Sequence, residues 1–116
     1  MTTIRDAAAA DVPGIAALER ECFSLPWTEE IVSSQLTGGG KVMLAAELDD
    51  ALAGYMGLQY VLDEGYVSNV CTAPEFRRRG VASALIDEMI RRARELELSF
   101  LSLEVRASNE AAISLY

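Results

Sequence analysis

Residues 70–86 constrain the fold of this chain more than any other segment. They read VCTAPEFRRRGVASALI: a short apolar strand, a proline-marked turn, three arginines, a glycine and the start of an amphipathic helix. A further strand is predicted after that helix, and several antiparallel strands before it. A strand, a crossover helix and a further strand that follow an antiparallel meander predict a mixed α/β sheet.

The turn at residues 77–82 has the chemistry of an anion site. Backbone N–H groups in the first turn of a helix lack intrahelical acceptors and lie at the positive end of the helix dipole, where phosphate is commonly held. Gly80 has no Cβ to obstruct a close approach. The alternative is a solvated basic helix start, but three cations at a helix N-terminus are unfavourable without an anion. We therefore predict that residues 78–83 hold pyrophosphate.

Length and composition predict one domain, residues 1–116, with a hydrophobic core. The chain is 51% hydrophobic and 24% charged, which is typical of a folded domain. No apolar run approaches the ~20 residues that span a bilayer. The first residues show no basic region followed by an apolar one, as an export signal would. We expect a cytoplasmic protein that does not bind membranes.

The charge balance and the missing histidine narrow the chemistry. A net charge of −8 argues against nucleic-acid binding and suits a basic peptide or amine, or solubility alone. The chain has no histidine, and Cys22 and Cys71 are far apart in the sequence, so no metal site is expected. Acid–base chemistry must then use carboxylates, tyrosine, cysteine, lysine or water.

Hydrophobic periodicity and turn residues predict the order of the elements. Helices are expected from Asp11 to about Cys22, from Thr28 to the glycines at 38–40, and after Gly80, with a last helix capped by Ser108 or Asn109. Strands are expected at residues 2–5, 42–48, 52–62, 66–72 and 100–105. Glycines at 54 and 57 inside a strand indicate a bulge or a close backbone approach.

Three further features allow two interpretations from the residues alone. Glu104 interrupts an apolar strand, so it either faces solvent or lies in a cleft. Tyr116 either packs or supplies a phenolic proton. The sequence Leu25-Pro26-Trp27 either staples a helix or forms the wall of a binding groove.

Several of these segments together resemble the GCN5-related N-acetyltransferases. That family's cofactor signature is Arg or Gln, two residues, Gly, one residue, then Gly or Ala, and residues 77–82 (RRRGVA) fit it. The segment LEVRASNEAAISLY at residues 103–116 and LPWT at residues 25–28 match the group that acetylates the N-terminal alanine of a small-subunit ribosomal protein. The resemblance covers nearly the whole chain. It implies an α/β acyl-CoA N-acyltransferase fold with a mixed central sheet flanked by helices.

The resemblance also implies acetyl-CoA as co-substrate, with no metal, and a role for each matching residue. Backbone groups of the strand at Val70, Cys71 and Thr72 would meet the pantetheine arm and the acetyl carbonyl. The turn would hold the pyrophosphate through Arg78, Arg79, Gly80, Val81, Ala82 and Ser83. The side chain of Asn109 would bind near the thiol end of the cofactor. Cys71 is otherwise interpreted as a packing residue.

For the transfer itself, the resemblance implies that Glu104 is the general base and that Tyr116 protonates the departing CoA thiolate. Leu25, Pro26 and Trp27 would shape a groove for the N-terminal segment of the ribosomal protein. An α-amine with a pKa near ~7.7–8.0 needs only a modest base, whereas lysine near ~10.4 needs a stronger one. Direct transfer requires no cysteine nucleophile.

The resemblance differs from this chain in one respect. The family continues past the matching tyrosine to complete the last helix and add two strands, so we expect the last strands to be missing from a C-terminally incomplete domain. An uncovered apolar sheet edge would then favour self-association and weaken catalysis. Alternatives are a lysine or small-amine acetyltransferase and a non-catalytic acyl-CoA-binding module. A Rossmann nucleotide-binding domain fits less well, because the chain lacks an early βαβ unit.

Overall fold

The computed structural model describes residues 2–37 and 39–103. Within these ranges, five strands form one sheet, and their order across the sheet is the same as their order in the chain. They are β1 (Thr3–Asp6), β2 (Lys41–Leu48), β3 (Ala51–Val61), β4 (Glu64–Thr72) and β5 (Phe100–Leu103). The helices are α1 (Val12–Cys22), α2 (Glu29–Ser34) and α3 (Val81–Glu95). Two short 3-10 turns, η1 (Ala9–Asp11) and η2 (Pro74–Phe76), precede α1 and α3.

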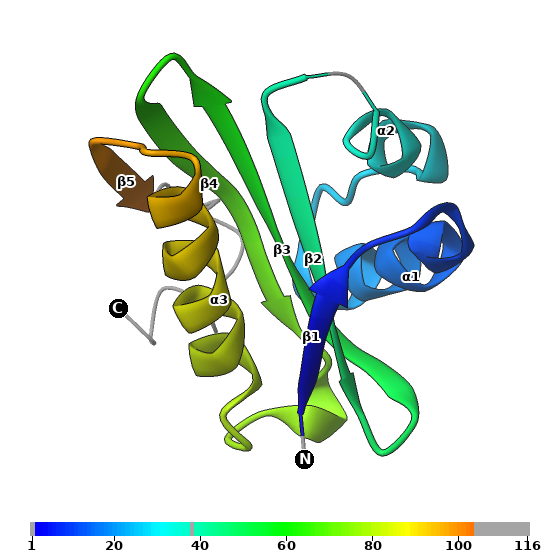
Figure 1. Ribbon diagram of the computed structural model, residues 1–116. Helices are drawn as coiled ribbons and strands as arrows, with labels where there is room; N and C mark the ends of the chain where they lie inside the picture. Colours follow the sequence, from blue (N-terminus) through cyan, green and yellow to red (C-terminus); the bar gives the residue numbers. More distant parts are fainter. Residues whose placement is uncertain (1, 38, 104–116) are drawn as a thin grey trace.

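The sheet is mixed, as predicted. Strands β1 to β4 form an antiparallel meander, and β5 pairs with β4 in parallel after the crossover helix α3. Helix α3 covers one face of the sheet, and α1 and α2 lie on the other (Figure 1). The sequence therefore predicted the mixed sheet correctly, with strand ends that differ by one or two residues, but the helix predicted to reach the glycines at 38–40 ends at Ser34. The strand predicted to reach residue 105 and the last helix lie outside the described residues.

Two hydrophobic cores fill the space on either side of the sheet. The core under α3 contains the buried stripe of that helix and inward side chains of β2, β3 and β4, including Leu44, Met56, Leu58, Val67, Val70, Val81, Leu85 and Met89. The core under α1 and α2 includes Ile15, Leu18, Phe23, Val32, Tyr55 and Cys71. The amphipathic helix predicted after Gly80 is confirmed, because the side chains at every fourth position from Val81 to Ala93 are buried. Ile90, which belongs to the same apolar stripe in the sequence, is exposed.

The first two helices begin beside the residues that the sequence predicted, Asp11 and Thr28, but the two side chains bond differently. The hydroxyl of Thr28 accepts the backbone N–H of Ile31 at 3.3 Å, as expected of an N-cap. Asp11 also occupies an N-cap position, but its side chain does not cap α1. The preceding 3-10 turn places Asp11 in helical geometry, so its carboxylate turns back to the Ala8 N–H and the Arg5 guanidinium.

Two irregularities in the meander explain the glycines of β3. The register shift beside Gly57 leaves Ser68 as an extra residue in β4, between pairs at Val67 and Asn69. This bulge reverses the alternation of β4, so Val67 and Val70 face α3. Gly54 lies where a Cβ would come within 2.4 Å of the Cys71 carbonyl oxygen. The predicted bulge and close approach are both confirmed.

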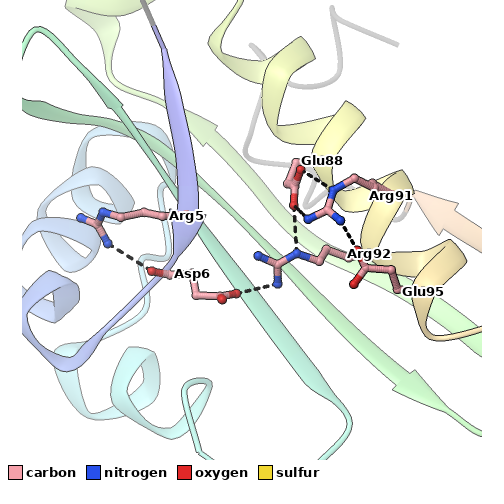
Figure 2. A network of polar contacts seen from close by, with 6 residues as sticks. All are labelled: Arg5, Asp6, Glu88, Arg91, Arg92 and Glu95. Carbon is pink, nitrogen blue, oxygen red and sulfur yellow. Dashed lines mark hydrogen bonds and ion pairs between the residues drawn. The ribbon is translucent and has the colours of Figure 1, made fainter.

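Charged side chains connect the outer surface of α3 to the first strand (Figure 2). Arg92 pairs with Asp6 of β1 at 2.6 Å and with Glu88 of its own helix at 2.9 Å. Arg91 bonds both Glu88 and Glu95 along the helix. The network joins β1 to α3, two elements that are far apart in the sequence.

Candidate functional site

The turn between β4 and α3 exposes the backbone groups that the sequence singled out. Arg78 and Gly80 have left-handed backbones, with φ of 65° and 79°. The N–H of Ala84 donates to the Gly80 carbonyl at 3.0 Å, which starts the hydrogen-bonding pattern of α3. The N–H groups of residues 81–83 precede that first bond and have no acceptor inside the helix. This is the geometry of an anion-binding helix start.

The arginines before α3 are exposed side chains that surround this turn. Arg79 lies 3.5 Å from Asp49 and stacks over the Phe76 ring, with 5.7 Å between its guanidinium carbon and the ring centroid. Arg77 and Arg78 form no ion pair among the described residues. Positive charge therefore gathers at a helix start, where only an anion would make it favourable.

The end of β4 lies directly beside this turn. Thr72 pairs with Gly54, and a Cβ on Gly54 would meet the Cys71 carbonyl, the Thr72 Cα and a Val81 methyl group. Val70 and Val81 are buried in the same core. The described ladder between β4 and β5 ends at Val67 and Leu103. The structure thus brings the two predicted cofactor segments, the β4 end and the α3 start, together.

Residues 25–27 form a loop between α1 and α2, called here the 25–27 loop. Leu25 is 80% exposed, Pro26 is exposed, and Trp27 is half-buried against the α1-side core. The backbone N–H of Trp27 donates to the carboxylate of Glu19 in α1 at 2.7 Å. An exposed leucine and proline beside an anchored aromatic fit either of the interpretations left open by the sequence.

A buried polar cluster, formed by Glu19, Tyr55 and Asn69, was missed by the sequence analysis. The Asn69 amide donates to Glu19 at 2.7 Å and to the Tyr55 oxygen at 3.1 Å, and the Tyr55 hydroxyl donates to Glu19. The bulge at Ser68 turns Asn69 toward α1. A signal was present, because Glu19 lies at helical spacing with Ile15 and Cys22, on the buried side of α1.

The two cysteines, distant in sequence, meet in space. Cys22 at the end of α1 and Cys71 in β4 form a disulfide, with their Cα atoms 6.5 Å apart, which is within the usual range. Cys71 is buried, as a packing residue would be, but the expectation that it only packs is wrong. The crossing of α1 over β4 brings the pair together, and sequence spacing carries no such information.

Three predicted site residues, Glu104, Asn109 and Tyr116, lie outside the described residues. Within the described ranges, no group of three or more metal-ligating side chains gathers. No helix in the same ranges is long and apolar enough to cross a membrane.

Comparison with known proteins identifies the family. Residues 12–116 match the acetyltransferase (GNAT) family. The chain belongs to this family. The match spans the strand–turn–helix segment and both cores, so the fold of a GNAT enzyme accounts for the mixed sheet and for the exposed start of α3.

Individual relatives agree with this assignment. The [ribosomal protein bS18]-alanine N-acetyltransferase of Salmonella typhimurium is 34% identical over 116 residues, which are 100% of this chain and 78% of that protein. The Escherichia coli protein of the same name is 33% identical over 125 residues, with the same coverage. The crystal structure of the ribosomal-protein-S18-alanine N-acetyltransferase from Escherichia coli superposes with a TM-score of 0.86 at 32% identity, and the match covers 100% of this chain and 74% of that one. These GNAT relatives are acetyltransferase enzymes.

Proposed function

We propose that this GNAT chain transfers the acetyl group of acetyl-CoA to the N-terminal alanine amine of a ribosomal protein. The observation that carries the proposal is the start of α3, where Arg78 and Gly80 adopt left-handed backbones and the N–H groups of residues 81–83 are free of helical acceptors. That arrangement fits a pyrophosphate. The names of the relatives, at 33–34% identity, support the acceptor.

Within the proposal, each segment has one task. The α3 start and Arg78 and Arg79 hold the pyrophosphate, and backbone groups of β4 at residues 70–72 meet the pantetheine arm. Asn109 binds near the thiol end. Acetyl-CoA supplies an activated acetyl group, so the protein needs to position the amine and move protons. The 25–27 loop forms one wall for the acceptor peptide.

Proton transfer is assigned to Glu104 and Tyr116. Glu104 takes a proton from the incoming amine, through water, and Tyr116 protonates the departing thiolate. Removing a general base commonly lowers kcat by about 10²–10⁴-fold. We expect Glu104→Gln to fall in this range while acetyl-CoA affinity, measured by calorimetry, stays unchanged. A variant as active as the parent chain would contradict the assignment.

Acceptor choice is tested by measuring thiol release from acetyl-CoA with three acceptors. These are a peptide that starts with alanine, the same peptide with a blocked α-amine and an internal lysine, and a polyamine. We expect release with the first alone, and mass spectrometry should place the acetyl group on the α-amine. Release with lysine or polyamine alone would instead indicate another GNAT specificity. Binding of acetyl-CoA with no release would indicate a non-catalytic module.

We also propose a cytoplasmic location, where a ribosomal protein would be met during or after its synthesis. Thiols are mostly kept reduced in that compartment. The Cys22–Cys71 disulfide does not fit that expectation, so alkylation of the two thiols in protein taken directly from cells tests this part of the proposal.

A further inference from the structure

Glu19 has no task in the proposed reaction, yet it is fully buried in α1. Burial of a carboxylate is costly unless hydrogen bonds compensate for the lost water. Among the described residues, its donors include the Trp27 backbone N–H, the Tyr55 hydroxyl and the Asn69 amide. Packing alone does not explain this choice, because an apolar side chain of similar volume often stabilises a core as well or better.

The two carboxylate oxygens of Glu19 serve different parts of the molecule. Oε1 accepts from Trp27 in the 25–27 loop at 2.7 Å. Oε2 accepts from Asn69 in β4 at 2.7 Å and from Tyr55 in β3. Asn69 is 2% exposed and directly precedes Val70, the first residue of the proposed pantetheine segment. One buried side chain thus connects the loop to the strand.

Asn69 presents its donor end to this carboxylate. Its amide nitrogen bonds both Glu19 and Tyr55, whereas its carbonyl oxygen is buried and has no hydrogen-bond partner among the described residues. The contacts with Glu19 and Tyr55 therefore orient the Asn69 side chain. A neutral amide in place of the Glu19 carboxylate would have only one oxygen to accept the hydrogen bonds that the two carboxylate oxygens now accept.

We infer that Glu19 is a positioning residue for the acceptor: it holds the 25–27 loop at a set distance from residues 70–72 of β4. The inference rests on the proposed function, because that proposal assigns the acceptor wall to the 25–27 loop. Glu19 acts through Trp27 and Asn69 and does not touch the reacting atoms. Its effect should therefore appear in acceptor binding, not in cofactor binding.

The test variant is Glu19→Gln, which keeps the side-chain length and removes one acceptor oxygen. We expect the KM for the alanine peptide to rise about tenfold, the size expected when a hydrogen bond to a charged group is lost. The dissociation constant for acetyl-CoA, measured by calorimetry, should change by less than about twofold, because the inference assigns Glu19 to acceptor binding and not to cofactor binding. Equal losses in both would indicate a general structural role and overturn the inference.

Two matched variants separate positioning from stability. Tyr55→Phe removes a donor from the same buried cluster but leaves the Trp27 bond in place, so the peptide KM should stay near that of the parent chain. Glu21→Gln removes an exposed carboxylate from the same helix and should change neither constant. A peptide KM that rises equally in Glu19→Gln and Tyr55→Phe would overturn the inference.

A second readout does not depend on activity. Trp27 is the single tryptophan of the chain, so its fluorescence reports on the 25–27 loop. We expect Glu19→Gln to shift the emission to longer wavelength and to increase acrylamide quenching, with Tyr55→Phe unchanged and circular dichroism native in both. Unaltered fluorescence in a folded Glu19→Gln variant would overturn the inference. Altered fluorescence in a chain that acetylates no peptide would support the anchor and reject the proposed function.

The parent chain offers a measurement in case Glu19→Gln does not fold. The Trp27 amide hydrogen donates to a buried carboxylate, so its exchange with solvent should be slow compared with the exposed amide of Ser24 in the same connection. Exchange of Trp27 as fast as that of Ser24 would show that the anchor does not form.

Discussion

Gly54 and Gly80 are glycines for different physical reasons. At Gly54 a Cβ would lie 2.4 Å from the Cys71 carbonyl oxygen, which belongs to backbone and cannot move aside cheaply. At Gly80 the space is open, but the backbone φ is 79°, which other residues adopt with strain. Gly54 leaves room for β4 to lie close to β3, whereas Gly80 allows the left-handed backbone at the start of α3.

A substitution at Gly54 should destabilise the fold. We expect Gly54→Ala to lower the free energy of unfolding by about 1–3 kcal/mol, the usual range for overpacking. Gly39 is the matched control, because a Cβ there meets nothing within 4 Å. Gly39→Ala should stay within about 0.5 kcal/mol. Urea denaturation measures both, and equal stability of the two variants would contradict the close approach.

A substitution at Gly80 should act on cofactor binding. Gly80→Ala strains the left-handed turn by about 1–2 kcal/mol, and relaxing it would move the N–H groups of residues 81–83. We expect weaker binding of acetyl-CoA in calorimetry. Gly80→Asn should retain more affinity, since asparagine tolerates this backbone better. Identical affinities of the alanine variant and the parent chain would count against the pyrophosphate site.

Helix α3 has one apolar face and one charged face, as its sequence pattern predicts. Its buried face packs on the sheet, and its outer face carries the Glu88, Arg91 and Arg92 network (Figure 2). The Arg91 guanidinium, together with Arg92, lowers the pKa of Glu88 to about 2. Arg5 similarly lowers the pKa of Asp11 at the start of α1. Ionised carboxylates therefore stabilise both helices, Asp11 by bonding the start of α1 to β1 and Glu88 by bonding two arginines within α3.

Low pH should reduce the stability that the ionised Glu88 gives to α3. A carboxyl group whose pKa is lower in the folded state stabilises the fold above its unfolded pKa, near ~4.3 for glutamate. That contribution is lost as pH falls from about 4.5 toward 2. Because Glu88 and its arginine partners lie at the surface, we expect their contribution to the free energy of unfolding to be about 1 kcal/mol or less. Glu88→Gln should flatten the pH dependence of unfolding over this window, whereas Asp87→Asn, an exposed neighbour, should leave it unchanged.

For the molecule as a whole, the disulfide links α1 to β4 across 49 residues. Closing a loop of this size restricts the unfolded chain and typically stabilises by about 2–4 kcal/mol. We expect reductant to lower the free energy of unfolding by this amount in urea titrations. A Cys22→Ser/Cys71→Ser variant should show no response to reductant. Free thiols by alkylation in the untreated protein would contradict the pairing.

Much of the architecture could be predicted because its determinants are local. The apolar stripe from Val81 to Ala93, the cap at Thr28 and the glycine-marked turn before α3 each depend on residues within one or two turns of one another. Gly54 likewise predicted a close approach, since a missing side chain is itself the signal. The neighbour that required it, the Cys71 carbonyl, was not visible in the sequence.

By itself, the sequence determined the order of the elements, the mixed sheet and the glycine-marked turn before α3, because hydrophobic period and turn chemistry act over short stretches of chain. Only the tertiary structure decided that Glu19 meets Tyr55 and Asn69 and that Cys22 meets Cys71. Those contacts depend on where α1 crosses the sheet and on the bulge at Ser68, which shifts the facing of β4 by one residue. A one-residue change of register leaves composition and period intact, and it determines which polar groups are buried together.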